Sequence, residues 1–191
     1  DGQMPGFVAI SAAFIGIISL GQVGIENFSI WTTATLAFIT AGAYLGFLPW
    51  NVFPQKIMPG YGGKALAGFL LATIAILSAA KVGTAILVLG VPLIDSFYVA
   101  ANRLLHGHSP VLDTRNHLHH RLLDAGWTKR QVALFYWGLS AILGIIALTL
   151  NAQQKLFTFV VLGVGLGMMI IWLNFYISWQ KKSASGNGLK T

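Results

Sequence analysis

The chain has 191 residues, of which 55% are hydrophobic and 9% are charged, and its formal net charge at pH 7 is +7. So few charged side chains cannot coat a water-soluble globule of this length, which indicates a membrane protein. The chain contains no cysteine, so disulfides and thiolate metal sites are excluded. In a membrane protein an excess of basic residues usually marks the cytosolic side, so we expect no nucleic acid partner.

Apolar runs long enough to cross a bilayer, which takes roughly 20 helical residues, occur six times along the chain. They cover residues 5–23, 30–49, 64–80, 82–103, 132–150 and 156–179. The runs lack the alternation of barrel strands, so they are predicted to be helices. The predicted fold class is all-α, a polytopic transmembrane helix bundle with about six spans.

One domain is expected over residues 1–180. The basic tail at 181–191 is rich in Ser, Gly and Lys and is predicted to be disordered. The chain opens on Asp1 without a Met and without a basic region ahead of an apolar signal. We therefore interpret it as the C-terminal part of a longer protein.

Basic residues predict the orientation, because Lys and Arg accumulate in short loops on the cytosolic side. If six helices alternate, only Lys81 and Lys155 fall on one side of the membrane. The other basic residues fall on the opposite side, in and around the loops near 50–63 and 104–131 and in the tail. These loops are therefore predicted to face the cytoplasm.

The first of these loops carries three glycines, Gly60, Gly62 and Gly63, between Lys56 and Lys64. Glycines beside a helix start let backbone N–H groups approach an anion, and the two lysines add positive charge for a phosphate. The spacing matches no Walker loop. The alternative is that Gly and Pro only turn the chain between two spans.

The second loop holds a histidine cluster, His117, His119 and His120, between Arg115 and Arg121. Imidazole and guanidinium groups at a membrane surface can bind diphosphate oxygens, and histidine can exchange a proton near neutral pH. If the stretch is helical, His117 and His120 share a face while His119 points elsewhere. The alternative is a solvated basic loop.

Asp95 is the third candidate, near the predicted cytosolic end of the run at 82–103. An ionisable side chain inside an apolar helix is costly, so it usually faces protein, water or a partner. Arg103 lies two turns further along. A structural ion pair or a helix-packing role is the alternative to a functional one.

At these residues the chain resembles the polyprenyl-phosphate N-acetylhexosamine-1-phosphate transferases, a bacterial glycosyltransferase family. The likeness runs over nearly the whole chain. It is densest at four places: Asp1-Gly2 with Gly6, Asn51 to Gly63, Gly90 to Arg103, and His117 to Leu123. The Leu-His-His-Arg-Leu-Leu string is the most specific match. The family's N-terminal half, with its Asp-Asp pair, is absent from this sequence.

The resemblance implies a site. It implies catalytic roles for Asp1 and His117, and metal binding by Asp1 and Asp95. It implies substrate-binding roles for Asn51, Lys56, Gly60, Gly63, Arg115, His119 and His120. The implied cofactor is Mg²⁺ or Mn²⁺. The implied fold is a multispanning helix bundle in the plasma membrane.

The resemblance also implies a reaction, in which an oxygen of polyprenyl phosphate attacks the β-phosphorus of a UDP-N-acetylhexosamine and UMP is released. Such reactions initiate cell-wall glycans, including peptidoglycan lipid, teichoic acid and O-antigen, and the sequence does not select among these sugars and pathways. A homodimer is compatible with the resemblance.

One position departs from the family pattern, because Tyr61 stands where the family has an aspartate expected to bind magnesium. A neutral phenol is a poor ligand for a hard cation. Either other acids hold the metal, or the chain is a degenerate homologue that acts as a membrane scaffold or lipid-binding protein. A di-iron desaturase is disfavoured because its metal site needs several histidine clusters, and the sequence has only five histidines. A haem protein is disfavoured because the clustered histidines lie in a loop and not within a span.

Overall fold

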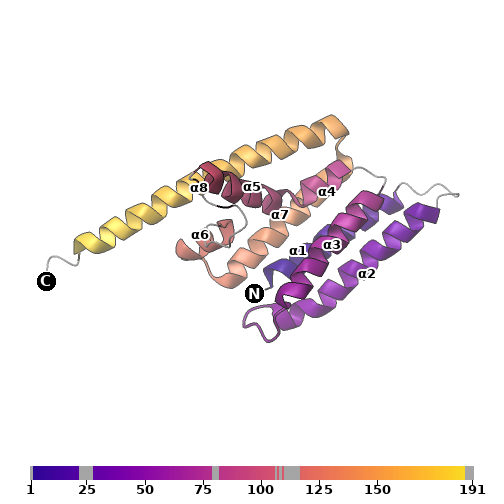
Figure 1. Ribbon diagram of the computed structural model, residues 1–191, viewed down its shortest axis with the longest axis horizontal. Helices are drawn as coiled ribbons and strands as arrows, with labels where there is room; N and C mark the ends of the chain where they lie inside the picture. The colour runs from indigo at the N-terminus through magenta and orange to yellow at the C-terminus, as the bar shows by residue number, and fades with distance from the viewer. Residues whose placement is uncertain are drawn as a thin grey trace.

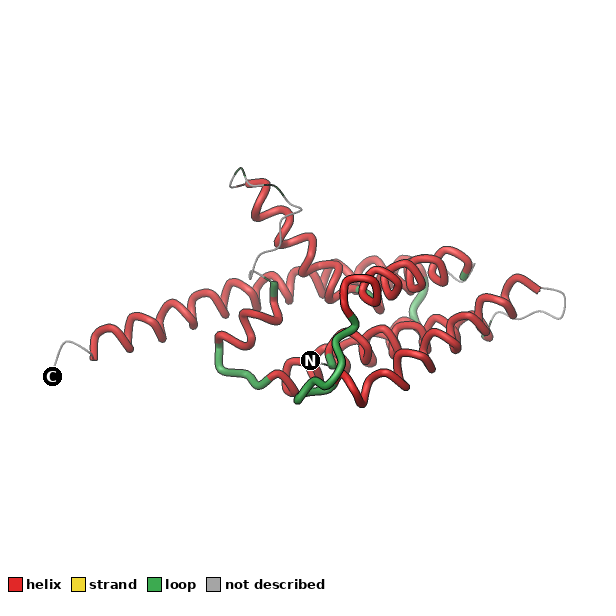
Figure 2. Tube along the Cα trace, turned by 60° about the horizontal axis from the view of Figure 1, so that its bottom comes forward, coloured by secondary structure: helices red, strands yellow, loops and turns green. Residues whose placement is uncertain are grey.

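The computed structural model describes residues 2–21, 28–78, 82–105, 107, 109 and 117–187. All regular structure in these ranges is helical, which confirms the predicted all-α class (Figure 1; Figure 2). The helices are α1 (Gln3–Leu20), α2 (Phe28–Asn51), α3 (Gly60–Leu77), α4 (Val82–Val88), α5 (Gly90–Leu105), α6 (Leu118–Asp124), α7 (Lys129–Thr149) and α8 (Ala152–Asn187).

Five of the described helices, α1, α2, α3, α7 and α8, are long and apolar enough to cross a membrane. They coincide with five of the six predicted spans, so the chain is a multi-pass helical membrane bundle. Their outward faces carry many large apolar side chains, including Ile39, Phe69 and Phe175, as expected for helices that face lipid. Where α1 and α2 lie together, small buried side chains such as Ala12, Ala37 and Ala41 line their faces.

The predicted run at 82–103 is not one regular helix, because it is described as α4 and α5 with a turn at Leu89 between them, although the Leu93 N–H still donates to the Leu89 carbonyl at 3.1 Å. Pro92 explains the break, since it has no N–H to donate to the carbonyl four residues earlier. That carbonyl, on Val88, instead accepts a hydrogen bond from the Ser140 hydroxyl of α7 at 3.4 Å. A neighbouring helix thus satisfies the freed backbone group, as the interior of a membrane protein requires.

Small residues let α1 and α7 approach closely. A Cβ added at Gly6 would collide with the ring of Trp137, and one added at Gly144 would collide with the ring of Phe14. Each glycine therefore leaves room for an aromatic side chain of the other helix, the usual way to pack helices tightly in a bilayer. This contact joins the two halves of the bundle.

The core has two main parts. One lies between α1, α2 and α3 around Val8, Ala41 and Leu71. The larger one lies between α4, α5, α6, α7 and α8, and it includes Leu118 and Leu122 of α6. The short helix α6 is thus packed on the second half of the bundle by its own apolar face.

Helix α8 extends beyond the other helices toward the C-terminus (Figure 1). It continues to Asn187, into the segment 181–191 that the sequence predicts to be disordered. Extending an existing helix needs no new nucleus. Residues 188–191 lie outside the described ranges.

Candidate functional site

The polar segments gather at one end of the bundle. The start of α1, the end of α2, the start of α3, helix α6 and the start of α7 all lie at this end, at the lower left of Figure 1. Alternating helices bring these ends together although they are far apart in sequence. The described parts of the predicted polar loops therefore lie at one end of the bundle (Figure 1).

Asn51, at the end of α2, is hydrogen-bonded to the start of α1. Its side chain is 2% exposed, and its Oδ1 accepts a hydrogen bond from the Gly2 backbone N–H at 3.0 Å. Its Nδ2 donates to the Ile57 carbonyl at 2.8 Å. Asn51 therefore holds the backbone beside Asp1, although Asp1 itself lies outside the described residues.

The loop between α2 and α3 is held by basic side chains. Lys56 lies over the Trp50 ring, with its Nζ 5.6 Å from the ring centre. The Arg130 Nε of α7 donates to the Phe53 carbonyl at 2.9 Å, and Lys129 lies 5.1 Å over the Phe53 ring. These contacts, which the sequence analysis did not predict, join the loop to the start of α7.

The glycines of this loop have local roles at the start of α3. Gly60 begins the helix with a φ of 64°, a conformation that favours glycine. The carbonyl of Gly63 accepts a hydrogen bond from the Tyr44 hydroxyl at 3.1 Å. Tyr61, at the position of the expected metal-binding aspartate, is 91% exposed.

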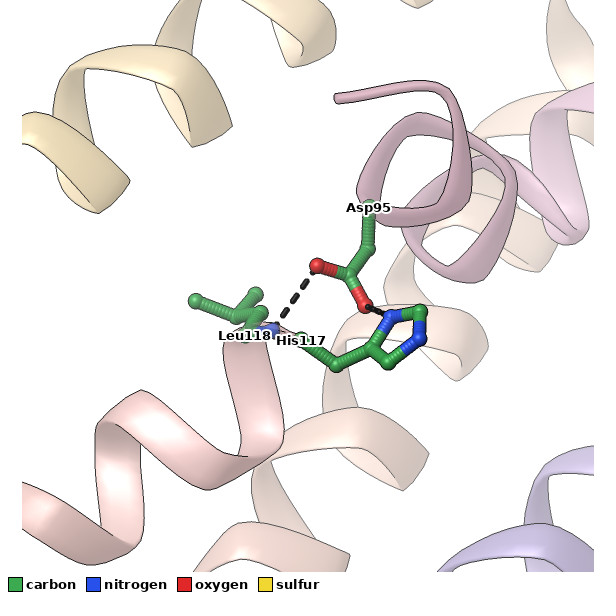
Figure 3. A network of polar contacts seen from close by, with 3 residues as sticks. All are labelled: Asp95, His117 and Leu118. Atoms are coloured by element: carbon green, nitrogen blue, oxygen red, sulfur yellow. Dashed lines mark hydrogen bonds and ion pairs between the residues drawn. The ribbon is translucent and has the colours of Figure 1, made fainter. Parts of the chain in front are cut away.

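Asp95 and His117 form the central pair of the site, although 22 residues separate them (Figure 3). The His117 Nδ1 lies 2.9 Å from Asp95 Oδ2, and the Leu118 backbone N–H donates to Asp95 Oδ1 at 2.8 Å. Asp95 is 6% exposed. One buried carboxylate thus orients the imidazole and also satisfies a free N–H at the start of α6.

His119 and His120 continue this cluster. The His119 ring is stacked on His117 with 5.8 Å between centres, and it lies 4.2 Å from the His120 ring. The three predicted histidines therefore stand together. Arg115, the remaining predicted residue of this loop, lies outside the described residues.

Tyr136 of α7 is a site residue that the sequence analysis missed. It is 3% exposed, and its hydroxyl is buried near the Asp95 carboxylate without a hydrogen-bond partner among the described residues. Next to it, Trp137 Nε1 donates to the Gln3 carbonyl at 3.3 Å. Hydrogen bonds thus join Asn51 to the start of α1 and the start of α1 to α7. A tyrosine within an apolar span was the signal in the sequence.

The described residues do not by themselves fit a divalent metal ion. No group of three or more His, Asp or Glu side chains among them is arranged to hold one. Both oxygens of Asp95 already accept hydrogen bonds from the start of α6, and Mg²⁺ prefers several oxygen ligands in octahedral geometry. A magnesium site would need carboxylates beyond these residues, such as that of Asp1.

Comparison with known proteins identifies the relatives of this chain. Residues 1–79 match the model of glycosyl transferase family 4. The decaprenyl-phosphate N-acetylglucosaminephosphotransferase of Mycolicibacterium smegmatis is 28% identical over 197 residues, covering 90% of this chain and 47% of that protein. The undecaprenyl-phosphate alpha-N-acetylglucosaminyl 1-phosphate transferase of Escherichia coli is 32% identical over 156 residues, covering 76% and 41%.

A third relative carries the same name as the Escherichia coli protein. It is the enzyme of Haemophilus influenzae, 30% identical over 152 residues, which cover 75% of this chain and 42% of that protein. The chain therefore spans less than half the length of these relatives. The matched regions include the ends of α1 and α2 that Asn51 ties together. The chain belongs to glycosyl transferase family 4, the polyprenyl-phosphate N-acetylhexosamine-1-phosphate transferases.

Proposed function

We propose that this chain is part of a membrane transferase that moves an N-acetylhexosamine-1-phosphate from a UDP-sugar to polyprenyl phosphate and releases UMP. The observation that carries the proposal is the buried Asp95, which fixes His117 at the start of α6 through a 2.9 Å contact to Nδ1. The names of the relatives support the sugar phosphate and the lipid acceptor.

In this reaction an oxygen of the lipid phosphate forms a bond to the β-phosphorus of the donor. The bond from that phosphorus to the oxygen bridging it to the α-phosphorus breaks, and the oxygen leaves with UMP. Negative charge builds up on the phosphoryl oxygens and on the leaving group, so fixed donors aimed at them lower the barrier. Catalysis of phosphoryl transfer depends mainly on such positioning and charge stabilisation.

His117 is the residue to which we assign contact with the donor diphosphate. Because Nδ1 faces Asp95, Nε2 is the ring nitrogen on the opposite side (Figure 3). An oriented imidazole can donate a hydrogen bond or carry a proton at a defined atom. His119 and His120 then widen the anion-binding surface, with Arg115 as a further candidate.

We also propose that this end of the bundle faces the cytoplasm in the plasma membrane, where UDP-sugars are found. The distribution of basic residues supports this orientation. Magnesium is proposed as the cofactor, and it would neutralise diphosphate charge when bound. Asp1 is the residue of this chain to which we assign metal contact.

The test is a transfer assay with the full-length protein in detergent or nanodiscs. Undecaprenyl phosphate, magnesium and a panel of labelled UDP-N-acetylhexosamines are supplied, and UMP and labelled lipid are measured. We expect both products in equal amounts with at least one donor. His117→Ala should reduce turnover by about 100-fold or more, whereas Gln153→Ala, an exposed amide at the far end of α8, should not.

Folded wild-type protein that yields neither UMP nor lipid-linked sugar with any donor would refute the proposed transferase. Turnover that is equal in the wild type and in His117→Ala would leave the reaction standing but remove His117 from it.

A further inference from the structure

Helix α6 carries His119 and His120 but is only seven residues long (Leu118–Asp124). A helix of this length is not stable alone, so its position depends on what it touches. Its apolar residues Leu118 and Leu122 are buried in the core. Apolar packing alone does not fix the direction of polar side chains at the surface, and the polar contacts of α6 therefore decide how the histidines are held.

The first set of polar contacts joins α6 to α5. Asp95 binds His117 and Leu118 at the start of α6. Three residues further along α5, the Tyr98 ring lies under the Arg121 guanidinium, 5.7 Å from the ring centre. Residues three or four apart share a face of a helix. One face of α5 therefore holds α6 at two points, His117 and Arg121.

The second contact joins α6 to α8. Arg121 Nη1 donates a hydrogen bond to Asn174 Oδ1. Asn174 lies within the apolar stretch Gln153–Trp179, which is long enough to span a membrane, and its side chain is exposed on the surface of α8. An amide is unfavourable in an apolar span unless it finds a polar partner. Arg121 supplies that partner, and its side chain reaches both α5 and α8.

We propose that Arg121 is a positioning residue for the transferase site, anchored by Asn174, and that it holds α6 so that His119 and His120 face the donor diphosphate. This inference rests on the proposed function. The guanidinium is suited to the role because it is planar, can stack on an aromatic ring and presents several donors at once. A lysine could keep the charge but not both contacts.

Hydrogen exchange tests the structural part of this proposal and does not require the protein to show transferase turnover. Amide exchange over residues 118–124 is compared in the full-length wild type, Arg121→Gln and Asn174→Ala, with Gln153→Ala as the matched amide control on α8. We expect faster exchange of these amides in the first two variants and wild-type exchange in the control. Unchanged protection in both Arg121→Gln and Asn174→Ala would overturn the proposal.

Steady-state kinetics test the positioning part. For Arg121→Gln and Asn174→Ala we expect the KM for the UDP-sugar to rise about 10-fold or more, because small displacements of binding groups are costly. The KM for polyprenyl phosphate should stay within about twofold, since α6 contacts the donor in this scheme. Asn174→Asp keeps an acceptor for Arg121, so its KM for the UDP-sugar should stay close to that of the wild type. Arg121→Lys should have a KM between those of the wild type and Arg121→Gln.

The double variant Arg121→Gln with Asn174→Ala should be no worse than the poorer single variant, because the two residues act through one contact. The proposal would be overturned if the effects of the two single variants multiplied in the double variant. It would also be overturned if the KM for polyprenyl phosphate rose as much as the KM for the UDP-sugar. A wild type without turnover would end the proposed function instead, and the exchange measurement would then still decide whether Arg121 and Asn174 hold α6.

Discussion

At the scale of single residues, Asp95 is predicted to stabilise the protein. Its carboxylate is buried and accepts from both His117 and the Leu118 N–H. In Asp95→Ala the buried N–H loses its partner, which costs about 1–3 kcal/mol. We expect a lower unfolding midpoint in detergent, measured by differential scanning fluorimetry, together with loss of transferase turnover.

The matched control is Asp124→Ala at the other end of α6. Asp124 is exposed, and an acid in the last turn of a helix is slightly unfavourable. Its removal should leave the midpoint unchanged or raise it slightly. Equal midpoints for the Asp95 and Asp124 variants would mean that the Asp95 contacts contribute nothing to stability.

The residues of the site were partly predictable. The histidine cluster and Asp95 stand out in the sequence because ionisable side chains are rare in this chain. Their pairing was not predictable, because spacing along the chain does not reveal which loop folds back on which helix. Tyr136 and Asn174 were overlooked since each is a single polar residue in an apolar run, which by itself only hints at a partner.

At the scale of helices, length and hydropathy predicted five long apolar helices correctly because both are local properties of the sequence. The fourth run was assigned as continuous although it contains Gly90 and Pro92. Proline in a membrane helix is often tolerated when neighbours satisfy the freed carbonyl, so the sequence alone does not say whether the helix bends or divides. The Ser140 hydroxyl that satisfies the Val88 carbonyl comes from another helix.

This contact gives a prediction for the break between α4 and α5. Ser140→Ala removes the donor to the buried Val88 carbonyl and should destabilise the protein by about 1 kcal/mol. Pro92→Ala supplies an N–H four residues after Val88, so the loss caused by Ser140→Ala should be smaller when Pro92→Ala is present. Thermal midpoints of the two single variants and the double variant measure this coupling.

Ser96→Ala is the control for this cycle, because Ser96 is exposed on α5. It should leave the midpoint unchanged with either residue at position 92. If Ser140→Ala costs the same in the wild type and in the Pro92→Ala variant, the Ser140 hydroxyl does not substitute for the missing N–H.

At the scale of the whole molecule, the joint between α1 and α7 decides whether the site assembles. Among the described residues, the polar start of α1 contacts α7 through the Gln3 carbonyl, which accepts a hydrogen bond from Trp137 Nε1 at 3.3 Å. The sequence predicted that the loops share one face, since alternating spans require it. It could not predict which helices touch, because that depends on matched shapes such as a glycine opposite an aromatic ring.

Two glycines of α7 allow this joint to be tested within one helix. Gly144 has no space for a Cβ because the Phe14 ring fills it, whereas Gly138 has no atom within 4 Å of the added Cβ. Gly144→Ala should push α1 and α7 apart and destabilise the protein by about 1–3 kcal/mol. Gly138→Ala should stabilise it by about 0.5–1 kcal/mol, because alanine is the better helix former.

The unfolding midpoints of the two variants should therefore move in opposite directions, and turnover should fall only in Gly144→Ala. A midpoint that rises in both would show that helix propensity outweighs the α1–α7 contact and that the joint is looser than the packing of Phe14 implies.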